Sequence, residues 1–162
     1  MKKMNTMAAI AAVCLMISRS EAQQITAKPE KATAAEISLA ARTANEQMKN
    51  AGTFALVAVS FKNRSAYEVG MLTQFRKGKA IIDEVLSKGA NLTDAEAARY
   101  DAKMKAVVEA MDALVSANTS AGGSQGSCFG SCDNQYQGWG HGKGWNRFWC
   151  KASCFKIEIH VG

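Results

Sequence analysis

The chain has 162 residues, of which 48% are hydrophobic, and it carries 20 lysines and arginines against 14 aspartates and glutamates. This length suits one ordinary domain, and a formal net charge of +6 is too small to argue for a nucleic-acid-binding protein. The mildly basic balance instead suits attraction to anionic membranes or envelope polymers. Composition leaves the oligomeric state open.

Residues 1–22 have the layout of a secretory signal peptide. Lys2 and Lys3 precede an apolar run over residues 7–17, and Ser20-Glu21-Ala22 then forms a small-x-small cleavage pattern. The apolar run is shorter than the roughly 20 residues that span a bilayer, so we predict a cleaved signal rather than an anchor. The mature chain, with 17 basic and 13 acidic residues, is therefore expected to be secreted or periplasmic.

The mature chain is predicted to contain two unlike parts joined by a linker. Residues 23–117 are rich in alanine and contain every leucine and methionine of the mature chain. Residues 128–162 contain neither of these, but hold all four mature cysteines and all three tryptophans. Between them, residues 118–127 are small, polar and glycine-containing, which is typical of a flexible linker.

Three stretches of residues 23–117 begin with a capping box, in which Ser or Thr is followed three residues later by Glu. These boxes span residues 33–36, 65–68 and 93–96. Apolar residues then recur at helical spacing, most clearly after the third box, at Tyr100, Met104, Val107, Met111 and Leu114. The pattern predicts a small antiparallel three-helix bundle, to which we assign no functional site.

Two further segments complete the predicted fold. Residues 53–61 are apolar enough for a buried strand or a buried helix, and we favour a helix because the neighbouring segments are helical. Residues 155–161 alternate strictly between apolar and polar side chains, which predicts a β-strand. The expected fold class is therefore mainly α, with a bundle followed by a short disulfide-stapled, glycine- and aromatic-rich module that ends in a strand.

The mature cysteines Cys128, Cys132, Cys150 and Cys154 form two C-x3-C pairs separated by a glycine-rich stretch. In an exported chain, an even number of cysteines favours disulfides. Residues four apart face the same side of a helix or a strand, and a reversal through the glycines makes the two segments antiparallel. We therefore favour nested bonds, Cys128–Cys154 and Cys132–Cys150. This arrangement resembles the twin C-x3-C hairpins of small disulfide-stapled peptides.

The same residues also allow metal-binding and catalytic interpretations. Four thiolates, with His141 and His160 as spare ligands, can also form a zinc site. The expected export favours disulfides, so we predict no metal and no cofactor, and a structural zinc module stays the reserve alternative. A disulfide-bonded cysteine is no nucleophile, and neither histidine has an obvious orienting carboxylate beside it in sequence. We predict that the protein is not an enzyme.

The span closed by the cysteines also combines tryptophans with basic residues. Exposed Trp beside Lys and Arg favours a membrane–water interface, whereas a small stapled module also needs aromatic side chains for its own core. Both interpretations concern the same candidate residues, which are Trp139, Lys143, Trp145, Arg147, Trp149 and Lys151.

Two function classes follow from this layout. In the first, the chain is a precursor whose cationic, aromatic C-terminal peptide acts outside the cell on an anionic membrane, with the helical part as a pro-region. This layout resembles that of secreted bacteriocin-like and toxin precursors. In the second, the chain stays intact as an exported binding protein, and its aromatic surface stacks on a glycan or envelope polymer.

Overall fold

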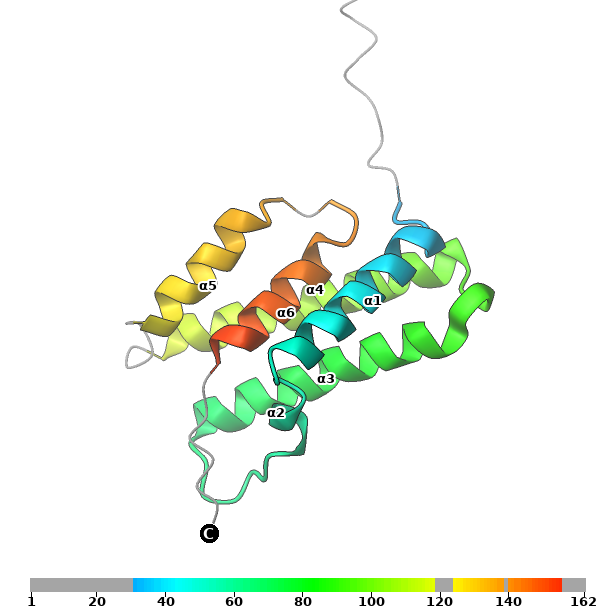
Figure 1. The fold of residues 1–162 in the computed structure, drawn as a ribbon. Helices are drawn as coiled ribbons and strands as arrows, with labels where there is room; N and C mark the ends of the chain where they lie inside the picture. Colours follow the sequence, from blue (N-terminus) through cyan, green and yellow to red (C-terminus); the bar gives the residue numbers. More distant parts are fainter. Residues whose placement is uncertain (1–30, 119–123, 139, 156–162) are drawn as a thin grey trace, which may run out of the picture. The chain divides into compact units, whose positions relative to one another are not determined.

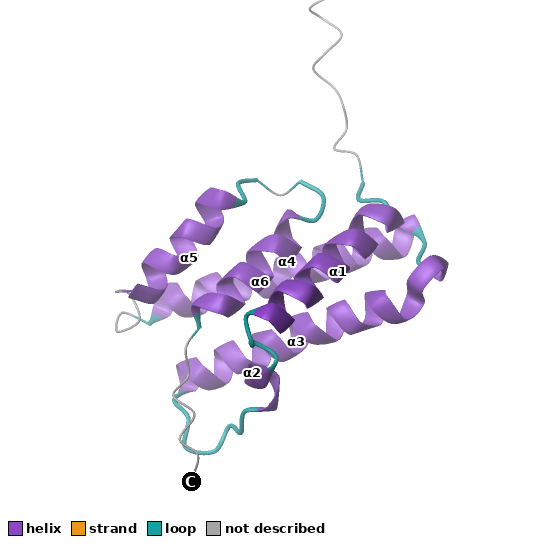
Figure 2. Cartoon of the chain, in the orientation of Figure 1, coloured by secondary structure: helices purple, strands orange, loops and turns teal. Residues whose placement is uncertain are grey.

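The computed structural model describes residues 31–118, 124–138 and 140–155, which are helical almost throughout (Figures 1 and 2). No strand occurs among them. The predicted signal peptide and residues 156–161 of the predicted strand lie outside the described residues, so the strand has no support. The helices are α1 (Ala34–Asn50), α2 (Ala55–Ala58), α3 (Ala66–Lys88), α4 (Asp94–Ala117), α5 (Ser124–Gln135) and α6 (Lys143–Cys154), with a 3-10 turn, η1, at Gly89–Asn91.

Helices α1, α3 and α4 begin at the predicted capping boxes. In α4, the Thr93 hydroxyl accepts a hydrogen bond from the backbone N–H of Glu96, whose carboxylate accepts one from the backbone N–H of Thr93 at 3.1 Å. The boxes at residues 33–36 and 65–68 show the same reciprocal bonds. Because these bonds satisfy amides that the first helical turn leaves unpaired, they confirm the three predicted helix starts.

The apolar segment at residues 53–61 is mostly not helical. Only Ala55–Ala58 form a single helical turn, and Val59 is extended. The side chain of Arg76 on α3 donates hydrogen bonds to the carbonyls of Val57 and Val59, at 2.9 and 2.7 Å. A side chain from another element thus satisfies carbonyls that a continuing helix would have paired, and the predicted longer helix is wrong.

Helices α1, α3, α4 and α6 pack together (Figure 1) and supply most of the buried core, to which Leu56 of α2 also contributes. The backbone N–H of Ala34 donates to Asp94 Oδ1 at 2.7 Å, so α1 and α4 start side by side, and they run in the same direction (Figure 1). Helix α6 runs with them and α3 runs against them. The three helices predicted for residues 23–117 therefore pack with a fourth that comes from the cysteine-rich segment. Helix α5 packs against α6 and α4 and contributes the buried Phe129 to this core.

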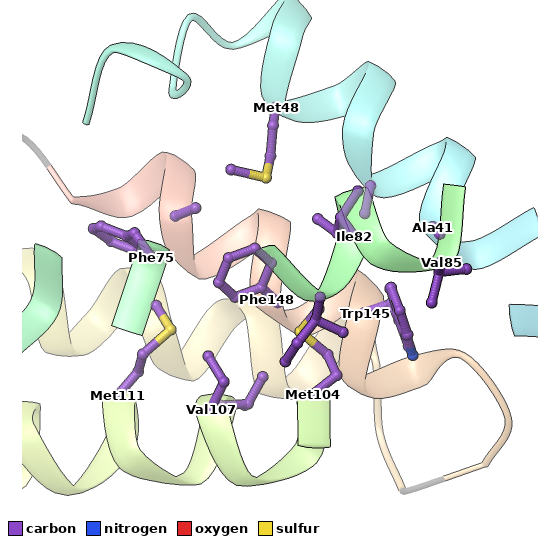
Figure 3. Packing of buried hydrophobic residues seen from close by; sticks show 14 of the residues in the cluster. Ala41, Met48, Phe75, Ile82, Val85, Met104, Val107, Met111, Trp145 and Phe148 are labelled. Carbon is purple, nitrogen blue, oxygen red and sulfur yellow. The ribbon is translucent and has the colours of Figure 1, made fainter. Parts of the chain in front are cut away.

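The core contact between α3 and α6 depends on a glycine. Phe148 of α6 is fully buried, and its ring meets that of Phe75 edge-to-face at 6.5 Å (Figure 3). A Cβ atom added at Gly78 would lie 2.2 Å from Cζ of Phe148. The missing side chain at Gly78 therefore leaves the space that the Phe148 ring fills.

Helix α5 begins inside the predicted flexible linker. Residues 124–127, which the sequence analysis assigned to the flexible linker, form the first turn of α5. None of the helices in the described parts of the chain is both long enough and apolar enough to cross a bilayer.

Candidate functional site

Helices α5 and α6 form an antiparallel hairpin joined by two disulfides. The bonds are Cys128–Cys154 and Cys132–Cys150, with Cα atoms 5.9 Å apart in each, as the sequence analysis favoured. The bonds lie next to each other, because Sγ of Cys132 and Sγ of Cys154 are 3.8 Å apart. In both helices the C-x3-C spacing places the two sulfurs on one face, and this face joins the helices.

Disulfide formation bears on the zinc and nucleophile alternatives. All four sulfurs are bonded, so none is a thiolate that can ligate zinc or attack a substrate. Within the described ranges, no group of three or more His, Cys, Asp or Glu side chains is placed to hold a metal ion. His141 is exposed in the turn before α6, and His160 lies outside the described residues.

Lys151, one of the predicted surface cations, is fully buried. Its ammonium group pairs with Asp112 of α4 and with Asp133 of α5, 2.8 Å from Oδ1 of the latter, and lies 5.2 Å from the centroid of the Phe129 ring. Burial raises the pKa of Asp112, and the hydrogen bond and charge of Lys151 oppose that shift. Lys151 therefore joins α4, α5 and α6 through charges that are paired inside the protein.

The start of α6 is held by α4 rather than by a cap of its own. Gly142 is the N-cap residue, with φ of 76° and no side-chain cap. Asp101 of α4 accepts a hydrogen bond from Nε1 of the fully buried Trp145 at 3.0 Å and another from the backbone of Gly142. Burial raises the pKa of Asp101, and these two bonds oppose the shift.

A different group of side chains remains accessible on the hairpin. The rings of Tyr136 and Trp149 meet edge-to-face at 5.9 Å, and both are half-buried. Trp149 Nε1 donates to Asn146 Oδ1 at 3.3 Å, and the exposed Lys143 donates to the carbonyl of Gln137 at 2.6 Å. We call Tyr136, Lys143, Asn146 and Trp149 the hairpin surface.

Hydrogen bonds to the backbone of Tyr136 hold part of the hairpin surface in position. The backbone N–H of Tyr136 donates to the carbonyl of Cys132 at 3.0 Å, and Nε of Arg147 donates to the carbonyl of Tyr136 at 2.9 Å. Trp149 precedes Cys150 and Tyr136 follows Cys132 by four residues, so the Cys132–Cys150 bond links the two segments that carry these rings. Arg147 itself is only 9% exposed, and its Nε lies 3.5 Å from Oδ1 of Asp133.

The six predicted binding residues therefore fall into three groups. Trp145, Arg147 and Lys151 are buried, Lys143 and Trp149 reach the surface, and Trp139 lies outside the described residues. Sequence reasoning missed Tyr136 and Asn146. Tyr136 follows Cys132 by four residues, so treating the C-x3-C segments as helices would have placed it beside Trp149.

Comparisons of this chain with family models, with curated proteins and with solved structures find no match. Its function must therefore be argued from the geometry of its own residues.

Proposed function

We propose that the chain acts intact, as an exported and disulfide-stabilised helical binding protein. The single observation that carries this proposal is that Trp145, Phe148 and Ala152 of the hairpin have no exposed surface within a core shared with α1, α3 and α4. Export itself is part of the proposal. It is supported by the predicted signal peptide and by disulfides, which persist mainly in oxidising compartments.

Burial of the hairpin argues for function without cleavage. Burying a large side chain such as Trp145 or Phe148 contributes roughly 2 to 3 kcal/mol relative to leaving it exposed. Release of the hairpin would lose both contributions, separate Lys151 from Asp112, and open the core of the remaining helices. A cut in the linker alone is therefore expected to leave the two pieces bound to each other.

The hairpin surface supports a carbohydrate or envelope polymer as the ligand. Sugar rings present C–H groups that pack on aromatic rings and hydroxyls that bond to amides and ammonium groups, and Tyr136, Trp149, Asn146 and Lys143 provide these partners. The Cys132–Cys150 bond joins the two segments that carry these rings, and such preorganisation lowers the entropy lost on binding.

The first experiment tests whether the chain acts intact. A specific protease site is inserted between Ala121 and Gly122, and the oxidised protein is cut and passed over a size-exclusion column without denaturant. We expect the two pieces to elute together and to separate only in denaturant. Spontaneous release of the C-terminal piece would contradict the proposal and favour the precursor interpretation.

The second experiment tests the ligand class. Oxidised mature protein is incubated with insoluble chitin, cellulose and peptidoglycan, and with vesicles of anionic lipid. We expect retention on at least one polymer, about tenfold weaker for Trp149→Ala, a loss that matches an aromatic anchor of roughly 1.4 kcal/mol. Phe61→Ala is the matched control, because Phe61 is an exposed aromatic residue that stacks under Arg76 away from the hairpin.

Circular dichroism must show that both variants are folded before retention is compared. Retention on no polymer, or equal loss in both variants, would contradict a glycan-binding hairpin surface. Binding to the anionic vesicles alone would do so as well, and would favour the membrane-active interpretation of the same residues.

A further inference from the structure

A groove lies between α1 and the end of α3, and no part of the proposed function uses it. Its volume is about 550 Å³. Its walls are formed mainly by Ala34, Ala35, Ser38 and Arg42 of α1 and by Val85 and Leu86 of α3. The volume is within the roughly 300 to 1,000 Å³ that is common for small-molecule sites.

The residue types that line this groove define what it can hold. Short side chains line its α1 wall and the turn after α3, at Ala35, Gly89 and Ala90, and this leaves room between the helices. Leu86 gives the opposite wall an aliphatic surface, with the largely buried Val85 and Leu92 beneath it. Such walls favour a hydrocarbon chain over a polar ligand.

The charged side chain at the rim of the groove determines which head group of the ligand fits. Among the described residues that line the groove, Arg42 is the charged one, and the Asp94 carboxylate, which accepts from the backbone N–H of Ala34, is not part of the lining. Its Nε donates to the carbonyl of Ser38 at 3.3 Å, which turns the guanidinium back along α1 toward the groove. A guanidinium group matches the two oxygens of a carboxylate, so the rim complements an anion.

We propose that this groove binds a single-chain anionic amphiphile, with its carboxylate at Arg42 and its hydrocarbon chain against Val85 and Leu86. The site is distinct from the hairpin surface, so this proposal goes beyond the proposed function and can fail without affecting it.

A second groove, between α3 and α4, provides an internal control. Its volume is about 450 Å³, and it also has an apolar floor, which includes Ile81 and Val107. Its rim, however, combines Lys77 and Lys103 with the carboxylate of Glu84. Glu84 offsets one of these lysines, and the rim has no guanidinium group to match both oxygens of a carboxylate, so it is a poorer match although its size and floor are similar.

The test uses the complete mature chain, oxidised, with decanoate as the probe and decanol as its uncharged counterpart. Isothermal titration calorimetry is expected to give one decanoate site per chain, about fivefold tighter than decanol, the ratio that an exposed charge pair typically produces. Arg42→Ala should reduce decanoate affinity to that of decanol. Lys77→Ala removes the same charge at the second groove and should change neither affinity.

A second pair of variants tests the hydrocarbon site. Ala35→Phe fills the first groove and should abolish binding of both probes, whereas Ala80→Phe, at an exposed alanine that lines the second groove, should not. The proposal is overturned if decanoate does not bind. It is also overturned if Arg42→Ala and Lys77→Ala have equal effects, or if filling the second groove blocks binding instead.

Discussion

Helices α1, α3 and α4 differ from the hairpin of α5 and α6 in what holds them in place. The first three begin with capping boxes made from their own residues, and they bury mainly aliphatic and methionine side chains. Helix α6 begins at Gly142 without a side-chain cap, and it buries Trp145, Phe148 and the paired charge of Lys151. Hydrogen bonds within their own first turns fix the starts of α1, α3 and α4, whereas contacts with other helices fix the hairpin of α5 and α6.

This difference teaches that the hairpin depends on the rest of the chain for its structure. Helices α5 and α6 have 12 residues each, a length at which isolated helices are marginal in water. Asp101, Asp112 and the two disulfides supply what these helices lack locally. In return, α6 covers the core of the other three, so a change in α6 should affect the whole molecule.

The largest expected effect comes from Phe148→Ala. Removing this buried ring should lower the free energy of unfolding by about 3 to 5 kcal/mol, because the space over Gly78 cannot refill. Urea unfolding followed by far-UV circular dichroism should show one transition at a lower midpoint. Trp149→Ala, at the half-buried neighbouring position, should cost clearly less. If α1, α3 and α4 kept the wild-type midpoint in Phe148→Ala, the hairpin and the bundle would not share a core.

Loss of the disulfides should have the next largest effect. Closing the 18-residue separation of Cys132–Cys150 is worth about 3 kcal/mol by loop entropy, and the bond nested around it adds less. Oxidised protein should have a mass four hydrogens below the fully reduced chain and should unfold at a higher urea concentration. A variant with Cys128, Cys132, Cys150 and Cys154 replaced by serine should unfold like reduced protein and should not respond to reductant. Unchanged stability on reduction would mean that α5 and α6 do not need the disulfides to stay folded.

Lys151→Met is expected to cost about 2 kcal/mol. Removing the buried ammonium leaves Asp112 and Asp133 without their shared partner, but both carboxylates are about 40% exposed, so water compensates part of the usual 3 to 5 kcal/mol penalty. Lys143→Met removes the same charge from an exposed position of the same helix and should be nearly neutral. Equal stability of the two variants, measured by urea unfolding, would show that the ion pairs of Lys151 with Asp112 and Asp133 do not stabilise the packing of α6.

The smallest effect concerns the capping box of α4. The side chain of Lys88, followed by the backbone and hydroxyl of Thr93, lowers the pKa of Glu96 to about 2 from an ordinary 4.5. Because the folded-state pKa is depressed, this stabilisation is complete above about pH 4.5 and is lost as the pH falls toward 2.

The melting temperature should therefore fall across this pH range, and Glu96→Gln should reduce the slope. Glu109→Gln, at an exposed position of the same helix, is the control and should leave the slope unchanged. An identical slope in Glu96→Gln and wild type would show that the box does not contribute to acid sensitivity.

Much of the helical part could be predicted because its signals are local. A capping box involves residues three apart, so the starts at Thr33, Ser65 and Thr93 are encoded in four-residue stretches. The segment at residues 53–61 could not be predicted in this way, since Arg76, remote in sequence, bonds its carbonyls. The candidate site was found only in part for a similar reason, because composition does not reveal which of several tryptophans and cations face inward.

The sequence by itself determined the three capped helices, and its C-x3-C spacing favoured the pairing of the four cysteines, because both depend on short separations along the chain. Tertiary structure alone decided that Trp145 and Lys151 are buried while Trp149 and Lys143 reach the surface. The physical reason is that the amphipathic side of α6 is defined by its partners: Gly78 leaves space for a ring, and Asp112 and Asp133 provide the charges that allow a lysine to be buried.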